Sequence, residues 1–171
     1  MRISFYILYL FIGHTFCSSL NLSDYDNIEE YYDIAIEFRK NGDSEQCLQM
    51  LLQIESSHIE SNYVIAEIYL NKIKSPNIAL DYYKQVMEKT YLFEKEKINP
   101  LKYRNLYRKS LFMTSYIYSN YLGMYSNAYE SYEIFLRKFP NDELIESVKY
   151  EIELLRPLEE NKNQIIRRSN G

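Results

Sequence analysis

Hydrophobic residues recur along the chain with the spacing of amphipathic helices rather than the alternation of strands. Apolar residues at positions 31, 34, 35 and 38 follow the i, i+3, i+4, i+7 pattern of one buried helix face. Asn27 and Glu30 precede this pattern with the spacing of a capping box, and Asn41-Gly42 stops it. The pattern therefore predicts a helix between Asn27 and Asn41.

The same signals divide the rest of the chain into further helices. Asp43 and Ser57 are suitable N-caps, and Ser75-Pro76 fits an N-cap followed by proline in the first turn. Asn99-Pro100 should interrupt a helix in the least regular region, 88–109. The predicted helices run from Asp43 to Ser56, from Ser57 to about Asn71, from Pro76 onward, from Leu101 to about Leu122, within Gly123–Asn141, and from Asp142 to Arg156.

Composition agrees with an all-α fold in a single domain. Only four glycines and four prolines occur in 171 residues, and strand-favouring Val and Thr are scarce. With 46% hydrophobic residues the chain can bury a core. A net charge of -4 with interspersed signs provides no basic stripe, so we expect no nucleic-acid partner.

The two ends differ from the middle. Residues 1–19 combine a short positive start, an apolar run and small residues, as in a secretory signal peptide, so we expect export. The destination would be the periplasm or cell envelope in a bacterium, or the secretory pathway in a eukaryote. Cys17 offers an alternative, in which a lipid on this cysteine associates the protein peripherally with a membrane. The segment 157–171 is predicted to be a polar tail.

Two hairpins share their internal spacing. Tyr31 precedes Gly42 by the same distance as Phe112 precedes Gly123, and the distances from these glycines to Cys47 and Ala128 also match. Two antiparallel helices approach closely only where a small side chain faces the neighbour, which fixes such distances. An ordinary helical bundle with similar periodicity is the alternative.

The chain resembles the tetratricopeptide-repeat family, and its second copy also resembles the related Sel-like repeat. The segment from Tyr129 to Leu155 is similar to repeats of bacterial envelope proteins of this type. The resemblance implies an α-solenoid within residues 20–156, with repeats at about 28–59, 60–90 and 109–141 and a capping helix at 142–156. The residues at the repeat-defining positions are Ala35, Gly42, Cys47, Ala66, Ala79, Gly123, Ala128, Tyr132, Phe135 and Pro140.

In this family the first helix of each repeat lines a concave groove that binds a protein or peptide. The ten matching positions, called the predicted groove below, are Tyr32, Ile36, Arg39, Tyr63, Glu67, Leu70, Met113, Ile117, Asn120 and Tyr121. The Lys and Asn residues that clamp a peptide carboxylate in some relatives are absent from these positions, which disfavours chaperone-tail binding.

Chemistry-bearing motifs are scarce. The histidines are His14, within the signal segment, and His58, which we expect to be solvated in a turn between helices. There is no glycine-rich phosphate loop, no Cys-x-x-Cys and no His-Glu-x-x-His, so we expect no enzyme activity, cofactor or metal. The carboxylates of the last predicted helix are interpreted as a solvated face.

These observations predict a non-enzymatic exported adaptor that mediates protein–protein interaction. One alternative is a lipid-anchored structural subunit of a membrane assembly, which depends on Cys17. Another is a small hydrolase or its accessory domain, which requires an acidic cleft to hold a pair of carboxylates.

Overall fold

A computed structural model describes residues 27–95 and 100–156, and in these ranges the protein is all-α, as predicted. The predicted signal segment, Cys17 and the polar tail lie outside the described residues. Residues 145–156 are also helical. The other helices are α1 (Ile28–Lys40), α2 (Ser44–Ile54), α3 (Ile59–Ile68), the π-helical segment η3 (Tyr69–Ile73), α4 (Pro76–Lys95), α5 (Pro100–Asn120) and α6 (Tyr125–Lys138).

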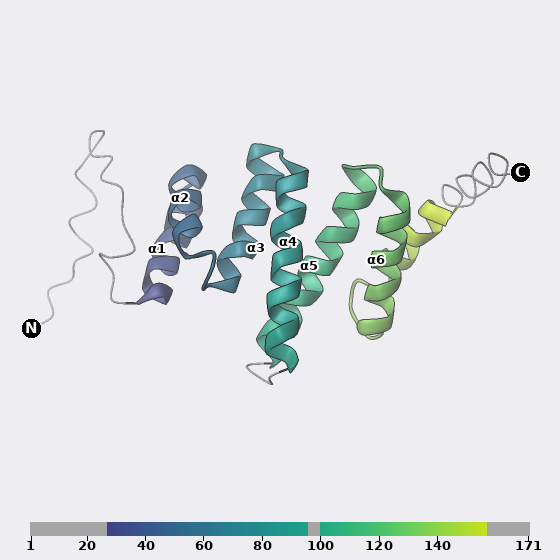
Figure 1. Ribbon diagram of the computed structural model, residues 1–171. Helices are drawn as coiled ribbons and strands as arrows, with labels where there is room; N and C mark the ends of the chain where they lie inside the picture. Colours follow the sequence, from purple (N-terminus) through teal and green to yellow (C-terminus); the bar gives the residue numbers. More distant parts are fainter. Residues whose placement is uncertain (1–26, 96–99, 157–171) are drawn as a thin grey trace, which may run out of the picture.

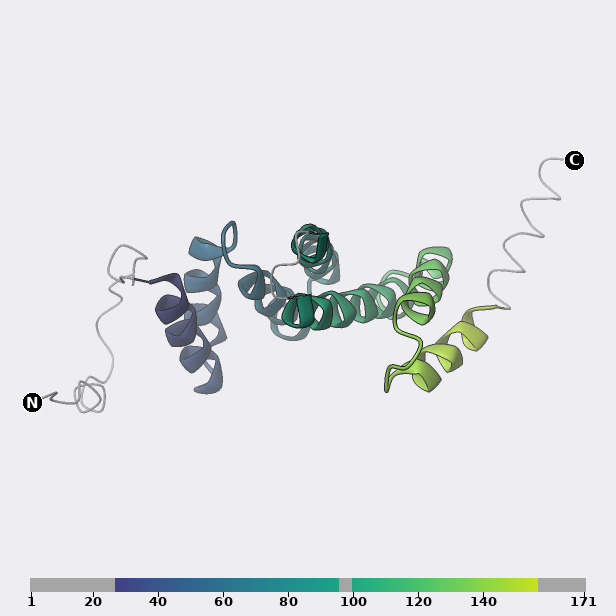
Figure 2. The same ribbon diagram turned by 90° about the horizontal axis from the view of Figure 1, so that it is seen from below.

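The helices form one elongated row in chain order (Figure 1). Each packs mainly on its neighbours in sequence, giving the hairpins α1–α2, α3–α4 and α5–α6. Figure 2 shows the same succession from below. The long α4 and α5 take up most of the region 88–109, which lacked a clear sequence pattern, and α5 begins at Pro100. The result is a helical-repeat arrangement in which each hairpin is covered by the next.

Local signals explain most helix ends. The side chain of Asn27 accepts from the N–H of Glu29, and that of Asp43 accepts from the N–H of Gln46. Gly42 adopts a φ of 89° after α1, where an added side chain would be strained. Gly123 adopts a φ of 61° and reverses the chain between α5 and α6. Both turn glycines therefore have the left-handed backbone that such a turn requires.

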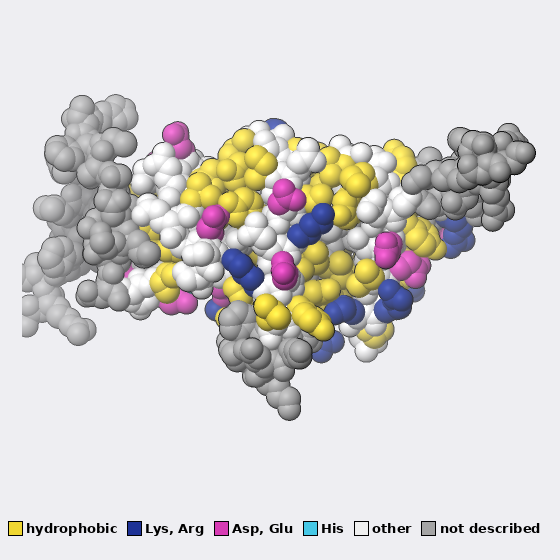
Figure 3. All heavy atoms as spheres, in the orientation of Figure 1, with side chains coloured by type: hydrophobic (Ala, Val, Ile, Leu, Met, Phe, Trp, Pro, Cys, Tyr) yellow, Lys and Arg dark blue, Asp and Glu magenta, His cyan; other side chains and the backbone are white. Residues whose placement is uncertain are grey.

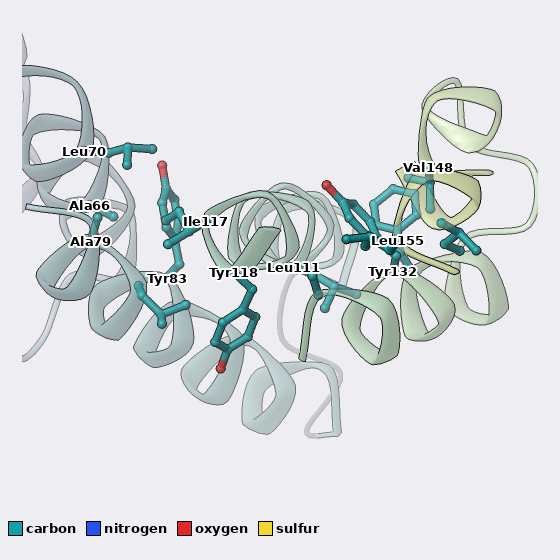
Figure 4. Close-up of a cluster of buried hydrophobic side chains, with 14 of the residues drawn as sticks. Ala66, Leu70, Ala79, Tyr83, Leu111, Ile117, Tyr118, Tyr132, Val148 and Leu155 are labelled. Atoms are coloured by element: carbon teal, nitrogen blue, oxygen red, sulfur yellow. The ribbon is translucent and has the colours of Figure 1, made fainter. Parts of the chain in front are cut away.

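The core consists of two clusters that share α3. One joins α1, α2 and α3, and the other extends from α3 to residues 145–156. Val64, Ile65 and Ile68 face the first cluster, whereas Ala66 faces the second. Most side chains of α3 are buried, and they point into both clusters, so α3 connects the two. Figure 4 shows the second cluster.

The small and aromatic residues at the predicted repeat positions are buried, apart from the turn glycines and Pro140, which follows α6. On α5, Tyr116 stands four residues after Phe112, the spacing at which the small Ala35 follows Tyr31 in α1. Its side chain stays partly exposed, with its ring 6.0 Å from that of Tyr121. Burial also raises the pKa of the free Cys47 thiol to about 11, which keeps it protonated and unreactive at neutral pH.

The last helix is held to α5 by a partly buried ion pair. Asp142 accepts from Arg108 at 2.8 and 2.9 Å through its two carboxylate oxygens, and from the N–H of Leu144. The helix starts at residue 145, three residues after the predicted Asp142, because Asp142 belongs to the turn that precedes it. Val148 and Ile152 then cover the end of the second cluster.

Candidate functional site

The structure brings together the five predicted groove residues of α1 and α3. Tyr32, Ile36 and Arg39 of α1 and Tyr63 and Glu67 of α3 are all partly exposed. Arg39 Nη1 lies 2.8 Å from Glu67 Oε2, so an ion pair links the first helices of two successive hairpins. These five residues form the N-terminal part of the predicted groove.

The two tyrosines of this surface are fixed by ring contacts. The Tyr32 ring lies 4.4 Å from that of His58, and the Tyr63 ring meets that of Tyr83 edge-on at 5.4 Å. Burial raises the pKa of both Tyr32 and Tyr63 to about 12, so their hydroxyls remain protonated at neutral pH. They can therefore donate hydrogen bonds to a ligand.

The prediction is wrong for Leu70 and Ile117, which are buried in the second cluster. Leu70 lies in η3 and packs in the second cluster. Figure 4 shows Ile117 directed towards Tyr83 of α4, because this side of α5 packs on the α3–α4 hairpin. Neither side chain can contact a partner on an open surface.

Of the three remaining groove residues, Met113 and Asn120 lie on α5, and Tyr121 follows its last residue. Met113 is partly buried against the second cluster, whereas Asn120 and Tyr121 are exposed. The Asn120 amide donates to the carbonyl of Tyr116 at 3.2 Å. Only these last two offer freely accessible side chains at this end of the predicted groove.

His58 is not the solvated turn residue that its position between helices predicted. Its side chain is 4% exposed, and Nδ1 accepts from the N–H of Ser61 as the N-cap of α3. Nε2 lies 3.4 Å from Glu29 of α1. Next to it, the buried Asn62 amide donates to the carbonyls of Glu55 and His58 at 2.7 and 3.1 Å. His58 and Asn62 thus anchor the turn between the first two hairpins.

Sequence reasoning missed a cleft of about 420 Å³ between α4 and α6, called the α4–α6 cleft below. Its floor is a stripe of α5 that contains Tyr107, Leu111 and Tyr118. Met87 of α4 and Ile134 of α6 stand on opposite walls. On each of the three helices the lining residues recur with helical spacing, which is the signal that the sequence offered. These three sets of residues could be assigned to one cleft only once the packing of the helices was known.

Cations sit over the aromatic rings of this cleft. Lys84 Nζ lies 5.3 Å from the centroid of Tyr118, and Lys138 Nζ lies 4.5 Å from that of Tyr107 and 5.9 Å from that of Tyr91. Such cation–π contacts hold an ammonium group beside an apolar surface. The cleft is therefore apolar with basic edges, unlike the acidic cleft that the hydrolase alternative requires.

The described residues contain no group of three or more His, Cys, Asp or Glu side chains arranged to hold a metal ion. None of the helices in the described part of the chain is both long and apolar enough to cross a membrane. Comparison with protein-family models, curated proteins and solved structures finds no significant match. The similarity to tetratricopeptide repeats therefore rests on the residue pattern.

Proposed function

We propose that this protein is a non-enzymatic, exported helical-repeat scaffold that binds an extended segment of a partner protein along the first helices of its hairpins. Export is inferred from the pattern of residues 1–19, and the repeat type from the matched spacings. The observation that supports the binding surface is the ion pair between Arg39 and Glu67, flanked by the partly exposed Tyr32 and Tyr63.

This surface has the chemistry of a peptide-binding strip. Tyrosine combines apolar area with one hydroxyl and has few rotatable bonds, so it binds at small entropic cost. Arg39 and Glu67 add a donor and an acceptor at fixed positions, with side chains 35% and 27% exposed. A partly exposed pair of this kind contributes about 1 kcal/mol to folding. Its charges are therefore better suited to setting the register of a bound segment than to holding the fold.

Site-specific photo-crosslinking in the native host tests the proposal. A photoreactive residue at Ile36 should capture a defined partner, whereas the same residue at the exposed Glu45 of α2 should not. The charge swap Arg39→Glu with Glu67→Arg keeps an ion pair and the melting temperature but inverts the polar pattern, so capture should be lost. Equal capture at both positions, or full capture by the swapped protein, would contradict the proposal.

A further inference from the structure

The α4–α6 cleft presents an uncovered apolar surface of helical dimensions. Both walls are helices packed on α5, and the lining of α4 extends from Lys84 to Tyr91, or about 10 Å along the helix axis. Leu111 lies on the floor between the walls. Figure 3 shows hydrophobic side chains on this face of the molecule, with Lys and Arg side chains among them. A cleft of this length accommodates about two turns of a bound helix.

The charges of the cleft select the kind of helix that fits. A smaller cavity of about 220 Å³ shares Lys138 with the cleft and adds Arg104, whose guanidinium lies 5.7 Å from the Phe139 ring. The two cavities together are lined by three cationic side chains, Lys84, Lys138 and Arg104, and one carboxylate, Glu88. Within the described residues neither lysine has an ion-pair partner. The cleft is locally basic on a chain with a net charge of -4.

We propose that the α4–α6 cleft is a docking site for an amphipathic helix of another protein, with carboxylates on both flanks of its apolar face. The apolar face would pack on Tyr91, Met87 and Ile134, above the buried Leu111, and its carboxylates would meet Lys84 at one end and Lys138 at the other. Helix-in-groove recognition of this kind uses anchors at i, i+3, i+4 and i+7. The inference does not depend on the predicted groove, because it uses different residues.

The openness of the cleft favours a helix over a small anionic amphiphile. A ligand such as a fatty acid is best held where most of its surface is enclosed. Here the space between α4 and α6 is bounded by helices on three sides, and its basic side chains stand at the edges rather than at a closed end. A helix with carboxylates on both sides of its apolar face can pair with the basic side chains of both edges at once.

Fluorescence anisotropy on the full chain provides the test. The probe is a labelled 18-residue helical peptide with leucines at i, i+3, i+4 and i+7 and glutamates on both flanks; a matched peptide carries lysines instead. We expect the acidic peptide to bind at least about tenfold more tightly at low salt. The double variant Lys84→Glu/Lys138→Glu should reverse this preference, whereas the matched control Lys72→Glu, on η3 and outside the cleft, should not.

Several results would overturn the proposal. These are equal affinity for both peptides, absence of binding, or the same change in preference in the Lys72→Glu control. Binding of dodecanoate in place of either peptide would make the cleft a small-amphiphile site. Self-association of the chain that is abolished by Lys138→Glu, measured by analytical ultracentrifugation, would make a second copy the occupant. Circular dichroism confirms that each variant, changed only at exposed lysines, stays folded.

Discussion

Replacing Ile117 by alanine should destabilise the protein far more than an equivalent change one turn later at Tyr121. Ile117 is 0% exposed and packs in the second cluster, whereas Tyr121 is 45% exposed. The substitution removes three buried carbon atoms, worth about 2.4 kcal/mol at about 0.8 kcal/mol each. The cavity left behind raises the cost to about 3–4 kcal/mol. That is a large part of the total of about 5–15 kcal/mol typical of a folded domain.

Urea unfolding followed by circular dichroism at 222 nm measures this loss as a shift of the midpoint at an unchanged slope. Tyr121→Ala is the control, because a substitution at an exposed position should change the free energy of unfolding by no more than about 1 kcal/mol. Hydrogen exchange should place the loss in α4, α5 and α6, since each helix packs mainly on its neighbours. A loss below about 1 kcal/mol for Ile117→Ala would refute its placement in the core.

Three further predictions concern other parts of the structure. Ala128→Glu would place an unpaired charge in a fully buried position between α5 and α6 and should abolish cooperative folding; an unchanged melting temperature would contradict the helix packing. Asp142→Asn removes the charge that pairs with Arg108 and should cost about 2 kcal/mol in urea unfolding, mostly as fraying of residues 145–156; uniform hydrogen-exchange protection there would argue against this anchor. Tyr32 and Tyr63 have a pKa of about 12 in the folded protein, against an ordinary value of 10.0. The stability that they contribute is therefore complete below pH 10 and declines towards pH 12. A melting temperature that stays constant from pH 9 to 11 would disprove their burial.

Much of the fold could be predicted from local patterns. Hydrophobic spacing and most cap residues predicted the helices, because the period of a helix and the hydrogen bonding of its first N–H groups depend on neighbouring residues. The prediction was wrong for Ser57, since His58 caps α3 instead. Asn27, Asp43 and Gly42 act where the pattern indicated. Small residues such as Ala35 and Ala128 were also expected at close helix contacts and are buried.

The candidate site was less predictable, because it depends on which face of each helix meets which neighbour. The four-residue spacing of Ile117 and Tyr121 predicts the same helix side for both, yet packing on the α3–α4 hairpin buries the first and leaves the second exposed. His58 could be interpreted as a turn residue from its neighbours, but its burial arises from the meeting of α1 with the turn before α3.

Local patterns along the chain suffice to specify amphipathic helices with defined starts, stops and close-contact positions. Where surfaces remain open depends on how these helices pack. The α4–α6 cleft exists because α4, α5 and α6 each contribute one stripe of side chains, and none of these stripes differs in composition from an ordinary partly buried helix face. Helical period is encoded within one turn of the chain, whereas a cleft depends on the angles and distances between helices far apart in sequence.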